Sequence, residues 1–306
     1  MIGRWTRGVA VSVVVVLLAA CGGGDAGTTT PVPASPGTVV ASPSGPSDLG
    51  SPGSKEIAMK LVSSAENATL DWRAQYGYIE DIGDGRGYTG GIIGFTSGTG
   101  DMLELVQAYA AQAPGNPLAA FLPALRDVNG TASHNGLGDS FVAAWKAAAQ
   151  SPEFRAVQDS ERDRVYFNPA VSMAKGDGLG ALGQFIYYDA AVVHGRGKGL
   201  FTLDGIRTTA MARAATPTQG GKEADYLNAF LDARVVAMKS EPAHQDVSRI
   251  ETAQRVFLQQ GNLSLRPPLT WKIYGDSYTI AEAWESDYAS AWRPSPSPPD
   301  VRPDLS

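Results

Sequence analysis

Two carboxylates in unlike surroundings, Glu66 and Asp84, are the residues of this sequence best suited to chemistry. Glu66 lies in the segment LVSSAEN (61–67), which has helical periodicity, whereas Asp84 lies in the glycine-rich turn DGRG (84–87). A protonated carboxyl that donates to a leaving oxygen and an ionised carboxylate that activates water together hydrolyse glycosidic bonds. Different surroundings allow a protein to keep one carboxyl protonated and the other ionised. The alternative interpretation is a surface glutamate and an aspartate that merely forms an Asp-Gly turn.

Neighbouring residues favour the chemical interpretation. Arg86 follows Asp84 closely and could keep it ionised, and the hydroxyl of Thr89 could hold a water molecule. Glu66 is expected near the end of a helix over about 55–67, where the negative end of the helix dipole disfavours an ionised carboxylate.

A second set of charges is expected among apolar residues. Asp189 lies in QFIYYDA (184–190) and Arg234 in LDARVV (231–236). A charge on an apolar helix face normally has a partner, so a network of Asp189, Arg234 and Arg249 is expected. It could support a catalytic site, be an ordinary buried ion pair between helices, or be both.

Other sites of chemistry are less well supported. The segment DIGDGRG (81–87) lacks the alternating ligands of a calcium loop, and GTGD (98–101) lacks the lysine of a phosphate loop. His134, His194 and His244 form no metal-ligand pair, and no G-x-S-x-G nucleophile elbow occurs. We therefore expect neither a metal nor a cofactor.

Composition limits the class of protein. The chain has 306 residues, of which 43% are hydrophobic, enough for a sizeable core. Its net charge of −6 argues against a nucleic-acid binder, which needs a basic face. The single cysteine, Cys21, excludes an internal disulfide and a cysteine-based zinc site.

The N-terminal region predicts export. Two arginines precede an apolar run that ends at LAAC (18–21), which resembles a bacterial lipoprotein signal with Cys21 as the lipidated residue. A plain secretory signal or an uncleaved anchor is the alternative. We therefore expect a signal peptide over 1–20, a flexible tether over 21–53, a folded domain over 54–280 and a disordered tail over 281–306.

The folded domain is predicted to be mainly helical. Asp101 is expected to cap a helix with Glu104 as its capping-box partner, and the stretch 89–98 to form a short strand pair or turn. Further helices are expected at about 101–112, 117–127, 140–150, 153–165, 180–194, 222–240 and 247–260.

Several blocks, taken in order, resemble the family 46 glycoside hydrolases, the bacterial chitosanases. The resemblance covers about 54–280. Among its blocks are LVSSAEN (61–67), QYGYIEDIGDGRGYT (75–89), ERDRVYF (161–167), YYDA (187–190), ADYLNAFLDAR (224–234) and TAQRVFL (252–258).

The resemblance implies a mainly α, two-lobed, lysozyme-like fold with a small β-sheet region and a substrate cleft between the lobes. It implies internal hydrolysis of chitosan with inversion, with Glu66 as general acid, Asp84 as general base and Thr89 positioning water. Asp189, Arg234 and Arg249 would form the supporting network. The implied substrate contacts are Asn67, Tyr78, Arg86, Thr99, Asp101, Tyr166, His194 and Glu241. Ala68 replaces a small hydroxyl residue associated with this position in the family, which puts one sugar contact in doubt.

The implied substrate is chitosan. Lipid on Cys21 would anchor the enzyme to the outer face of the cell membrane, and an enzyme shed from its anchor would be extracellular. We expect a monomer that binds no nucleic acid. Carboxylates such as Asp101 and Glu241 could bind the ammonium groups of chitosan, and neutral chitin would leave them unpaired. Inversion requires carboxyls roughly 6.5–9.5 Å apart, or more in an open cleft, against about 5–5.5 Å for retention.

Overall fold

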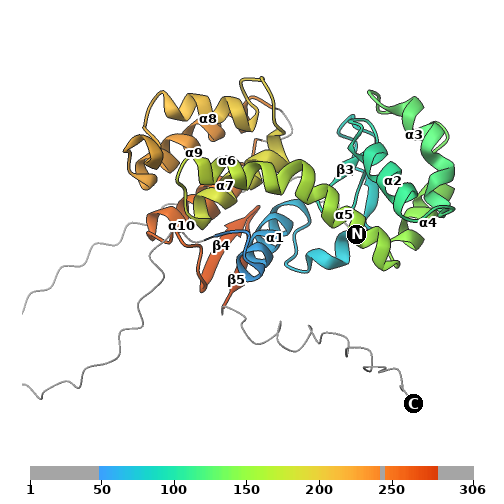
Figure 1. Ribbon diagram of the computed structural model, residues 1–306, viewed down its shortest axis with the longest axis horizontal. Helices are drawn as coiled ribbons and strands as arrows, with labels where there is room; N and C mark the ends of the chain where they lie inside the picture. The colour runs from blue at the N-terminus through green and yellow to red at the C-terminus, as the bar shows by residue number, and fades with distance from the viewer. Residues whose placement is uncertain (1–47, 242–244, 282–306) are drawn as a thin grey trace, which may run out of the picture. The chain divides into compact units, whose positions relative to one another are not determined.

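The computed structural model describes residues 48–241 and 245–281 (Figure 1). The predicted signal peptide with Cys21, almost all of the predicted tether and all but the first residue of the predicted tail lie outside the described residues, as does His244. The α-helices are α1 (Pro52–Glu66), α2 (Asp101–Gln112), α3 (Leu122–Val128), α4 (Asp139–Ala148), α5 (Pro152–Arg162), α6 (Asn168–Gly176), α7 (Ala181–His194), α8 (Leu203–Met211), α9 (Glu223–Lys239) and α10 (Arg255–Gln259). The 3₁₀-helices are η1 (Trp72–Gly77), η2 (Pro117–Phe121) and η4 (Pro217–Gln219), and the π-helices are η3 (Asp163–Phe167) and η6 (Ile250–Gln254). The strands are β1 (Ile79–Asp81), β2 (Tyr88–Gly90), β3 (Phe95–Thr96), β4 (Leu269–Ile273) and β5 (Asp276–Ile280).

Helix α1 presents one apolar face and ends where the sequence predicts. Ile57 and Leu61 are buried on that face, and Pro52 occupies the first turn, where its missing N–H has no intrahelical partner to lose. The helix ends at Glu66, and Ala68 just beyond it has a positive φ of 52°. The chain therefore turns away sharply and leaves the carboxyl of Glu66 at the end of a rigid element.

A small antiparallel sheet carries the other candidate carboxylate. Its strand order is β1-β2-β3, with Asp81 opposite Tyr88 and Thr89 opposite Thr96. Asp84 lies in the loop 82–87 between β1 and β2, so the two strands hold both ends of that loop. The predicted strand pair at 89–98 corresponds to β2 and β3.

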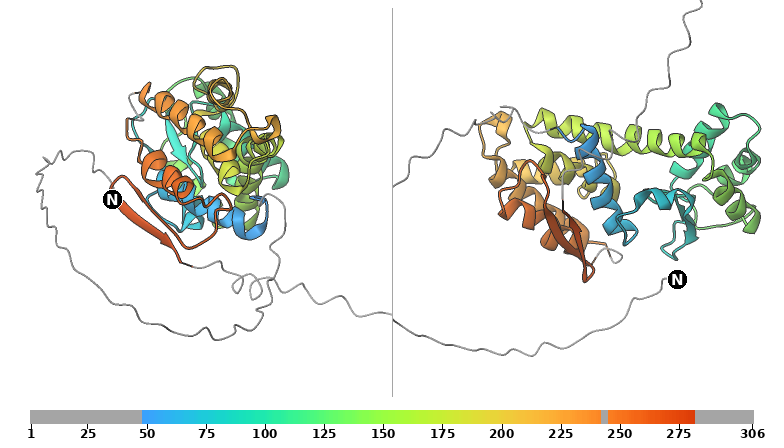
Figure 2. Two further views of the ribbon diagram at one scale, coloured as in Figure 1. Left: turned by 90° about the vertical axis from the view of Figure 1, so that its left-hand side faces the viewer. Right: turned by 90° about the horizontal axis from the view of Figure 1, so that it is seen from below.

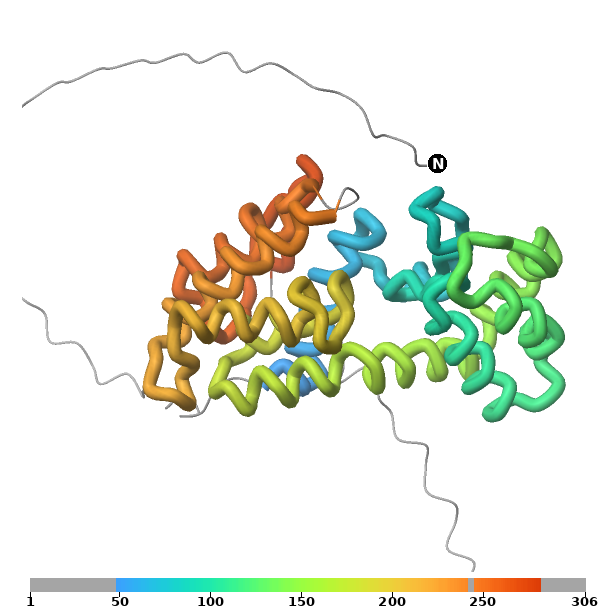
Figure 3. Tube along the Cα trace, turned by 90° about the horizontal axis from the view of Figure 1, so that it is seen from above, coloured from blue at the N-terminus to red at the C-terminus, as the bar shows by residue number. Residues whose placement is uncertain are grey.

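A continuous helical run, α5–η3–α6, connects two lobes (Figures 1 and 3). On one side, α2 packs on α5, α3 packs on α2, and α4 packs on β1 of the three-stranded sheet. On the other, α7 to α10, the β4–β5 hairpin and α1 form the second lobe, which Figure 2 shows from two further directions. The predicted mainly α, two-lobed fold with a small β region is confirmed.

Each lobe has its own aromatic core. In the first, Trp145 is fully buried and meets Phe154 edge to face, with ring centroids 5.1 Å apart. In the second, Tyr187 stacks on Phe230 at 4.8 Å, and Trp271 of β4 donates its indole N–H to Ser64 of α1 at 3.0 Å. Such rings bury large areas, and each lobe therefore provides a rigid base for the residues at its edge.

The predicted cap of α2 is wrong. Gly100, with φ of 90°, occupies the N-cap position, and Asp101 is the first helical residue. The carboxylate of Asp101 turns back to the preceding loop and accepts the N–H of Thr96 at 2.9 Å. Glu104 pairs with Arg164 across the surface at 2.7 Å instead of closing a capping box.

The packed structure begins earlier than the composition indicates. Leu49, in the segment expected to be a tether, is fully buried, and its N–H donates to the side chain of Gln184 at 2.9 Å. Asp48 beside it pairs with Lys175 of α6 at 2.7 Å, so a large apolar residue and a charge together hold this segment against the folded domain.

Candidate functional site

Glu66 lies at the end of α1 and contacts a buried arginine. Its Oε1 is 2.9 Å from Nη1 of Arg249, and its side chain is 30% exposed. Nη2 of the same guanidinium lies 2.7 Å from Oδ1 of Asp189. Arg249 therefore links the partly exposed carboxyl of Glu66 to a buried carboxylate.

The buried part of this network is fully paired at Asp189. Nη1 of Arg234 lies 2.7 Å from Oδ2 of Asp189, and Gln254 donates to the same oxygen at 2.6 Å. Burial opposes ionisation of Asp189, but the charges of Arg249 and Arg234 outweigh it and hold its pKa below the usual range. Burial likewise opposes the charge on Arg249, yet Asp189 and Glu66 raise its pKa. Asp189 and Arg249 therefore stay charged at neutral pH.

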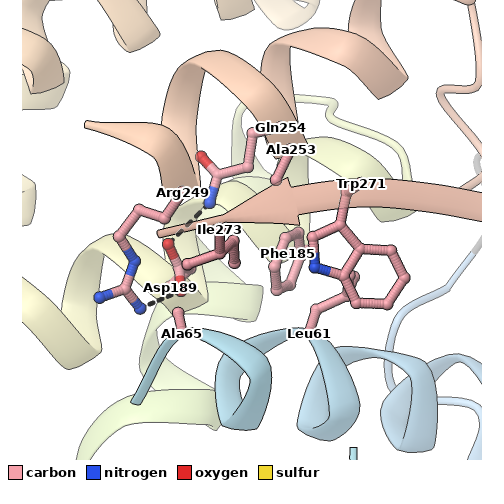
Figure 4. Close-up of a pocket in the computed structure, with 9 residues that line it drawn as sticks. All are labelled: Leu61, Ala65, Phe185, Asp189, Arg249, Ala253, Gln254, Trp271 and Ile273. Atoms are coloured by element: carbon pink, nitrogen blue, oxygen red, sulfur yellow. Dashed lines mark hydrogen bonds and ion pairs between the residues drawn. The ribbon is translucent and has the colours of Figure 1, made fainter. Parts of the chain in front are cut away.

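Figure 4 shows a pocket beside this network. Asp189, Arg249 and Gln254 form one side, and apolar residues of α1, α7, η6 and β4 form the rest. The apolar lining residues are Leu61, Ala65, Phe185, Ala253, Trp271 and Ile273. This lining keeps the network in surroundings of low polarity, where charge interactions are strong.

Asp84 has the contacts of an ionised carboxylate. Arg86 donates its backbone N–H to Oδ1 at 3.0 Å and its Nε to Oδ2 at 2.8 Å, and its Nη2 lies 2.6 Å from Oδ2. The loop can close this tightly because Gly87 has φ of 72° and a Cβ there would lie 2.4 Å from the hydroxyl of Ser97. The Asp84 side chain is only 14% exposed.

Thr89 follows the same loop on β2 and is buried, with 8% exposure. Within the described part of the chain, its Oγ1 has no hydrogen-bond partner. A buried hydroxyl without a partner is costly, so this group is available to a water molecule or a ligand.

A second polar cluster surrounds Asp101. Thr99 donates to Oδ1 of Asp101 at 2.8 Å, and the hydroxyl of Tyr166 lies 3.4 Å from Oδ2. Burial raises the pKa of Asp101, while the donors from Thr99 and Thr96 oppose the rise. Burial and the nearby carboxylate of Asp101 also raise the pKa of Tyr166.

The other predicted site residues lie at separate places. Asn67 follows Glu66 and caps α1, and Tyr78 precedes β1 with its hydroxyl 3.4 Å from Glu80. His194 ends α7, and Glu241 follows α9. The structure thus groups Glu66 with Asp189, Arg234 and Arg249, groups Asp84 with Arg86, and groups Asp101 with Thr99 and Tyr166.

Sequence reasoning missed Gln254 and Thr96 as members of these groups. Gln254 also accepts from Nη1 of Arg234 at 2.9 Å, so it holds both partners of the buried ion pair. It lies five residues beyond Arg249, a spacing that brings two side chains to the same side of a π-helix such as η6 but not of an α-helix, so an α-helical pattern would not have found it. Thr96 contributes a backbone N–H, which no side-chain pattern indicates.

The residues that the structure describes include no cluster of three or more His, Cys, Asp or Glu side chains arranged to hold a metal ion. Nor do they contain a helix with the length and apolarity needed to cross a membrane. A carboxyl such as that of Glu66 or Asp84 can transfer a proton to or from a bound group, and a hydroxyl without a partner among the described residues, such as that of Thr89, can hold a water molecule.

Comparisons with known proteins agree on one family. The sequence profile of glycosyl hydrolase family 46 matches residues 60–269. A chitosanase of Streptomyces sp. is 66% identical over 232 residues, which span 76% of this chain and 84% of the relative. A chitosanase of Nocardioides sp. is 60% identical over 232 residues, 76% of this chain and 83% of that protein.

Solved structures agree with the sequence matches. The co-crystal structure of chitosanase OU01 with substrate has a TM-score of 0.76 and 63% identity, covering 77% of this chain and all of that chain (100%). A complex of a Gynuella sunshinyii family 46 chitosanase with chitotetraose has a TM-score of 0.69 and 34% identity. The match covers 74% of this chain and 96% of that chain.

Proposed function

The chain belongs to glycosyl hydrolase family 46, and from this premise we propose that it is an endo-acting, inverting chitosanase. It hydrolyses chitosan, cleaving internal β-1,4 bonds between glucosamine units in a single displacement. The observation that supports this most directly is that the two carboxyls have different partners. Glu66 contacts Arg249, which also contacts Asp189, whereas Asp84 contacts Arg86 of its own loop.

Glu66 is the proposed general acid. Nη1 of Arg249 contacts the Glu66 carboxyl while Nη2 contacts the buried Asp189, so a second carboxylate holds the guanidinium in place. Its N–H fixes where the Glu66 carboxyl lies. Partial exposure at the end of α1 leaves the carboxyl open to the glycosidic oxygen, to which it donates the proton.

Asp84 is the proposed general base, and Thr89 positions the water that it activates. Asp84 is held in its acceptor form by three donors of Arg86, and the free hydroxyl of Thr89 lies on the strand that follows the same loop. The water attacks the anomeric carbon on the face opposite the departing oxygen, and Asp84 takes its proton. One displacement of this kind inverts the configuration.

Substrate charge explains a preference for chitosan. A glucosamine ammonium is a strong donor to a carboxylate, and Asp101 and Glu241 are the proposed acceptors. Other proposed sugar contacts are Asn67, Tyr78, Arg86, Thr99, Tyr166 and His194. The relatives are chitosanases, and two of the matched structures hold substrate or chitotetraose.

The test follows viscosity and reducing ends together while the full chain acts on fully deacetylated chitosan, on chitin and on peptidoglycan. We expect a rapid fall in chitosan viscosity with few new ends. Slow viscosity loss with many new ends would contradict internal cleavage. Cleavage of chitin or peptidoglycan in preference to chitosan would favour a lysozyme-like specificity. Binding of a polysaccharide without any product would instead indicate a tethered polysaccharide-binding protein.

We also propose that the chain is exported and lipidated on Cys21, with the segment rich in Gly, Pro, Ser and Thr that follows it as a tether to the catalytic domain. The LAAC (18–21) pattern after an apolar run supports this. Detergent phase partitioning of the protein from expressing cells tests it, with Cys21→Ala as the control. The native chain should enter the detergent phase and the variant the aqueous phase; equal partitioning of both would contradict the lipid anchor.

A further inference from the structure

The loop that carries Asp84 has two ends, and one side chain from elsewhere touches both. Asp81 ends β1 and Tyr88 begins β2, and the two are opposite each other in the sheet. His134 comes from the segment between α3 and α4. Its Nε2 lies 3.1 Å from Oδ2 of Asp81, and its ring stacks on Tyr88 with centroids 4.2 Å apart at 23°.

Both contacts lead directly into the loop. Oδ1 of Asp81 accepts the N–H of Gly83 at 2.8 Å, the residue just before Asp84. On the other side, Tyr88 donates its N–H to Ser97 at 3.0 Å and precedes Thr89. A displacement of the imidazole would therefore be transmitted to the residues on either side of the proposed base and its water.

The segment that supplies His134 is itself tied to the loop through the backbone. Gly130 donates its N–H to the carbonyl of Gly98 at 2.8 Å, and Gly98 donates to the carbonyl of Arg86 at 2.9 Å. Leu137 is fully buried and donates to the carbonyl of His134 at 2.8 Å. These bonds fix where the imidazole lies relative to the loop.

We propose that His134 is a positioning residue for Asp84, bracing the loop 82–87 at both ends so that Asp84 and Thr89 keep the separation needed to activate water. This inference rests on the proposed function. The side chains of His134 and Asp81 are 35% and 36% exposed, so their contact adds little to global stability. Catalysis is far more sensitive to small displacements of a reacting group than stability is.

The test measures kcat, KM and the unfolding temperature of His134→Asn and His134→Phe on fully deacetylated chitosan. The asparagine removes the stacking, and the phenylalanine keeps stacking on Tyr88 but loses the contact with Asp81. We expect kcat to fall about tenfold in His134→Asn and less in His134→Phe, with KM changed less than twofold, because the displaced group acts in the transition state.

Lys55→Met is the matched control. Like His134, Lys55 contacts a carboxylate and an aromatic ring: its Nζ lies 2.5 Å from Oδ2 of Asp163 and 4.7 Å from the ring centroid of Phe167. Lys55 lies near the start of α1, at the opposite end of that helix from Glu66. It should keep its kcat. The proposal is overturned if His134→Asn keeps kcat within twofold of the native value, or if Lys55→Met loses as much kcat as His134→Asn for the same fall in unfolding temperature.

A second readout separates this inference from the proposed function. In an Asp84→Asn background, His134→Asn should cause no further loss of kcat, because the histidine acts through Asp84. An additional tenfold loss would overturn the positioning role while leaving Asp84 as base. Native activity in Asp84→Asn alone would instead refute the proposed general base.

Discussion

At the scale of single residues, the role proposed for each carboxyl rests on the donors around it. Glu66 shares Arg249 with Asp189, whereas Asp84 has Arg86 to itself. We predict that Glu66→Gln and Asp84→Asn each fold normally and lose activity by about 10²–10⁴-fold, the contribution typical of a general acid or base. Reducing-end assays on chitosan, with circular dichroism to verify folding, measure this.

Glu251→Gln is the matched control for this prediction. Glu251 is likewise paired with an arginine, Arg255 at 3.0 Å, but lies on the exposed surface of η6 with 40% side-chain exposure. It should keep native activity. Substantial activity in Glu66→Gln would refute the assignment of the acid.

The buried network is predicted to be a large contributor to stability. Asp189→Asn removes the charge that compensates two arginines with at most 5% exposure, and breaking a buried pair of this kind costs about 3–5 kcal/mol. Asp204→Asn, which breaks an exposed pair with Arg196, should cost at most about 1 kcal/mol. Urea unfolding of both variants measures the difference; equal costs would contradict the account.

The carboxylate of Asp189 also predicts a pH dependence of stability. Its pKa is lower in the folded state than the ordinary 3.8, so its stabilising contribution is fully present above that value and declines as the pH falls below it. The difference in unfolding free energy between the native chain and Asp189→Asn should therefore shrink between about pH 4 and pH 2. Unfolding curves at pH 7, 4 and 2 test this, and a difference that grows on acidification would have the wrong sign.

At the scale of elements, periodicity predicted the helices better than their ends. The apolar face of α1 and its end at Glu66 follow from the side-chain pattern, as do the bounds of α2. The cap of α2 was wrong because Gly100, next to Asp101, can adopt the positive φ that the tight turn requires. A sequence pattern does not show which of two adjacent good capping residues the tertiary structure selects.

Other elements were missed for identifiable reasons. Helix α8 contains a glycine and two threonines, which weaken helix propensity, and is stabilised by packing against α9. The hairpin β4–β5 did have a signal, since Leu269, Trp271 and Ile273 are buried alternately along β4. That period of two predicts a strand, and the Tyr-Gly pair that follows is a suitable turn.

The loop of Asp84 depends on a close backbone approach at Gly98. A Cβ at this position would lie 2.4 Å from the carbonyl oxygen of Thr131 and 2.7 Å from that of Arg86. We predict that Gly98→Ala costs about 1–3 kcal/mol of stability, as overpacking does, and lowers kcat because Arg86 must shift. Thermal unfolding and kinetics measure both effects.

Gly53→Ala provides the comparison. A Cβ there meets no atom within 4 Å, and its position in α1 favours alanine over glycine. The variant should be as stable as the native chain or slightly more so. Equal losses in the two variants would mean that the close approach at Gly98 is not the cause.

At the scale of the whole molecule, the proposed site draws on both lobes. Glu66 lies at the end of α1 in the second lobe, and Asp84 lies in the loop between β1 and β2 of the first. The candidate carboxylates were predictable because glycine-rich turns and helix ends leave local patterns. The contact of Arg249 with Glu66 has no local signal, because residues far apart in the sequence meet only through packing of α1, α7 and η6. Resemblance to a family placed Arg249 in a supporting network, and the fold supplies its contacts.

We propose that one displacement by water, activated at Asp84, cleaves the bond. The most direct test is proton NMR of the reducing ends formed in the first minutes of chitosan hydrolysis by the full chain, before the anomers interconvert. We expect a β-linked chain to yield the α-anomer first, because attack from the opposite face inverts the anomeric carbon. Initial release of the β-anomer would show two displacements through a covalent intermediate and would contradict the roles given to Asp84 and Thr89.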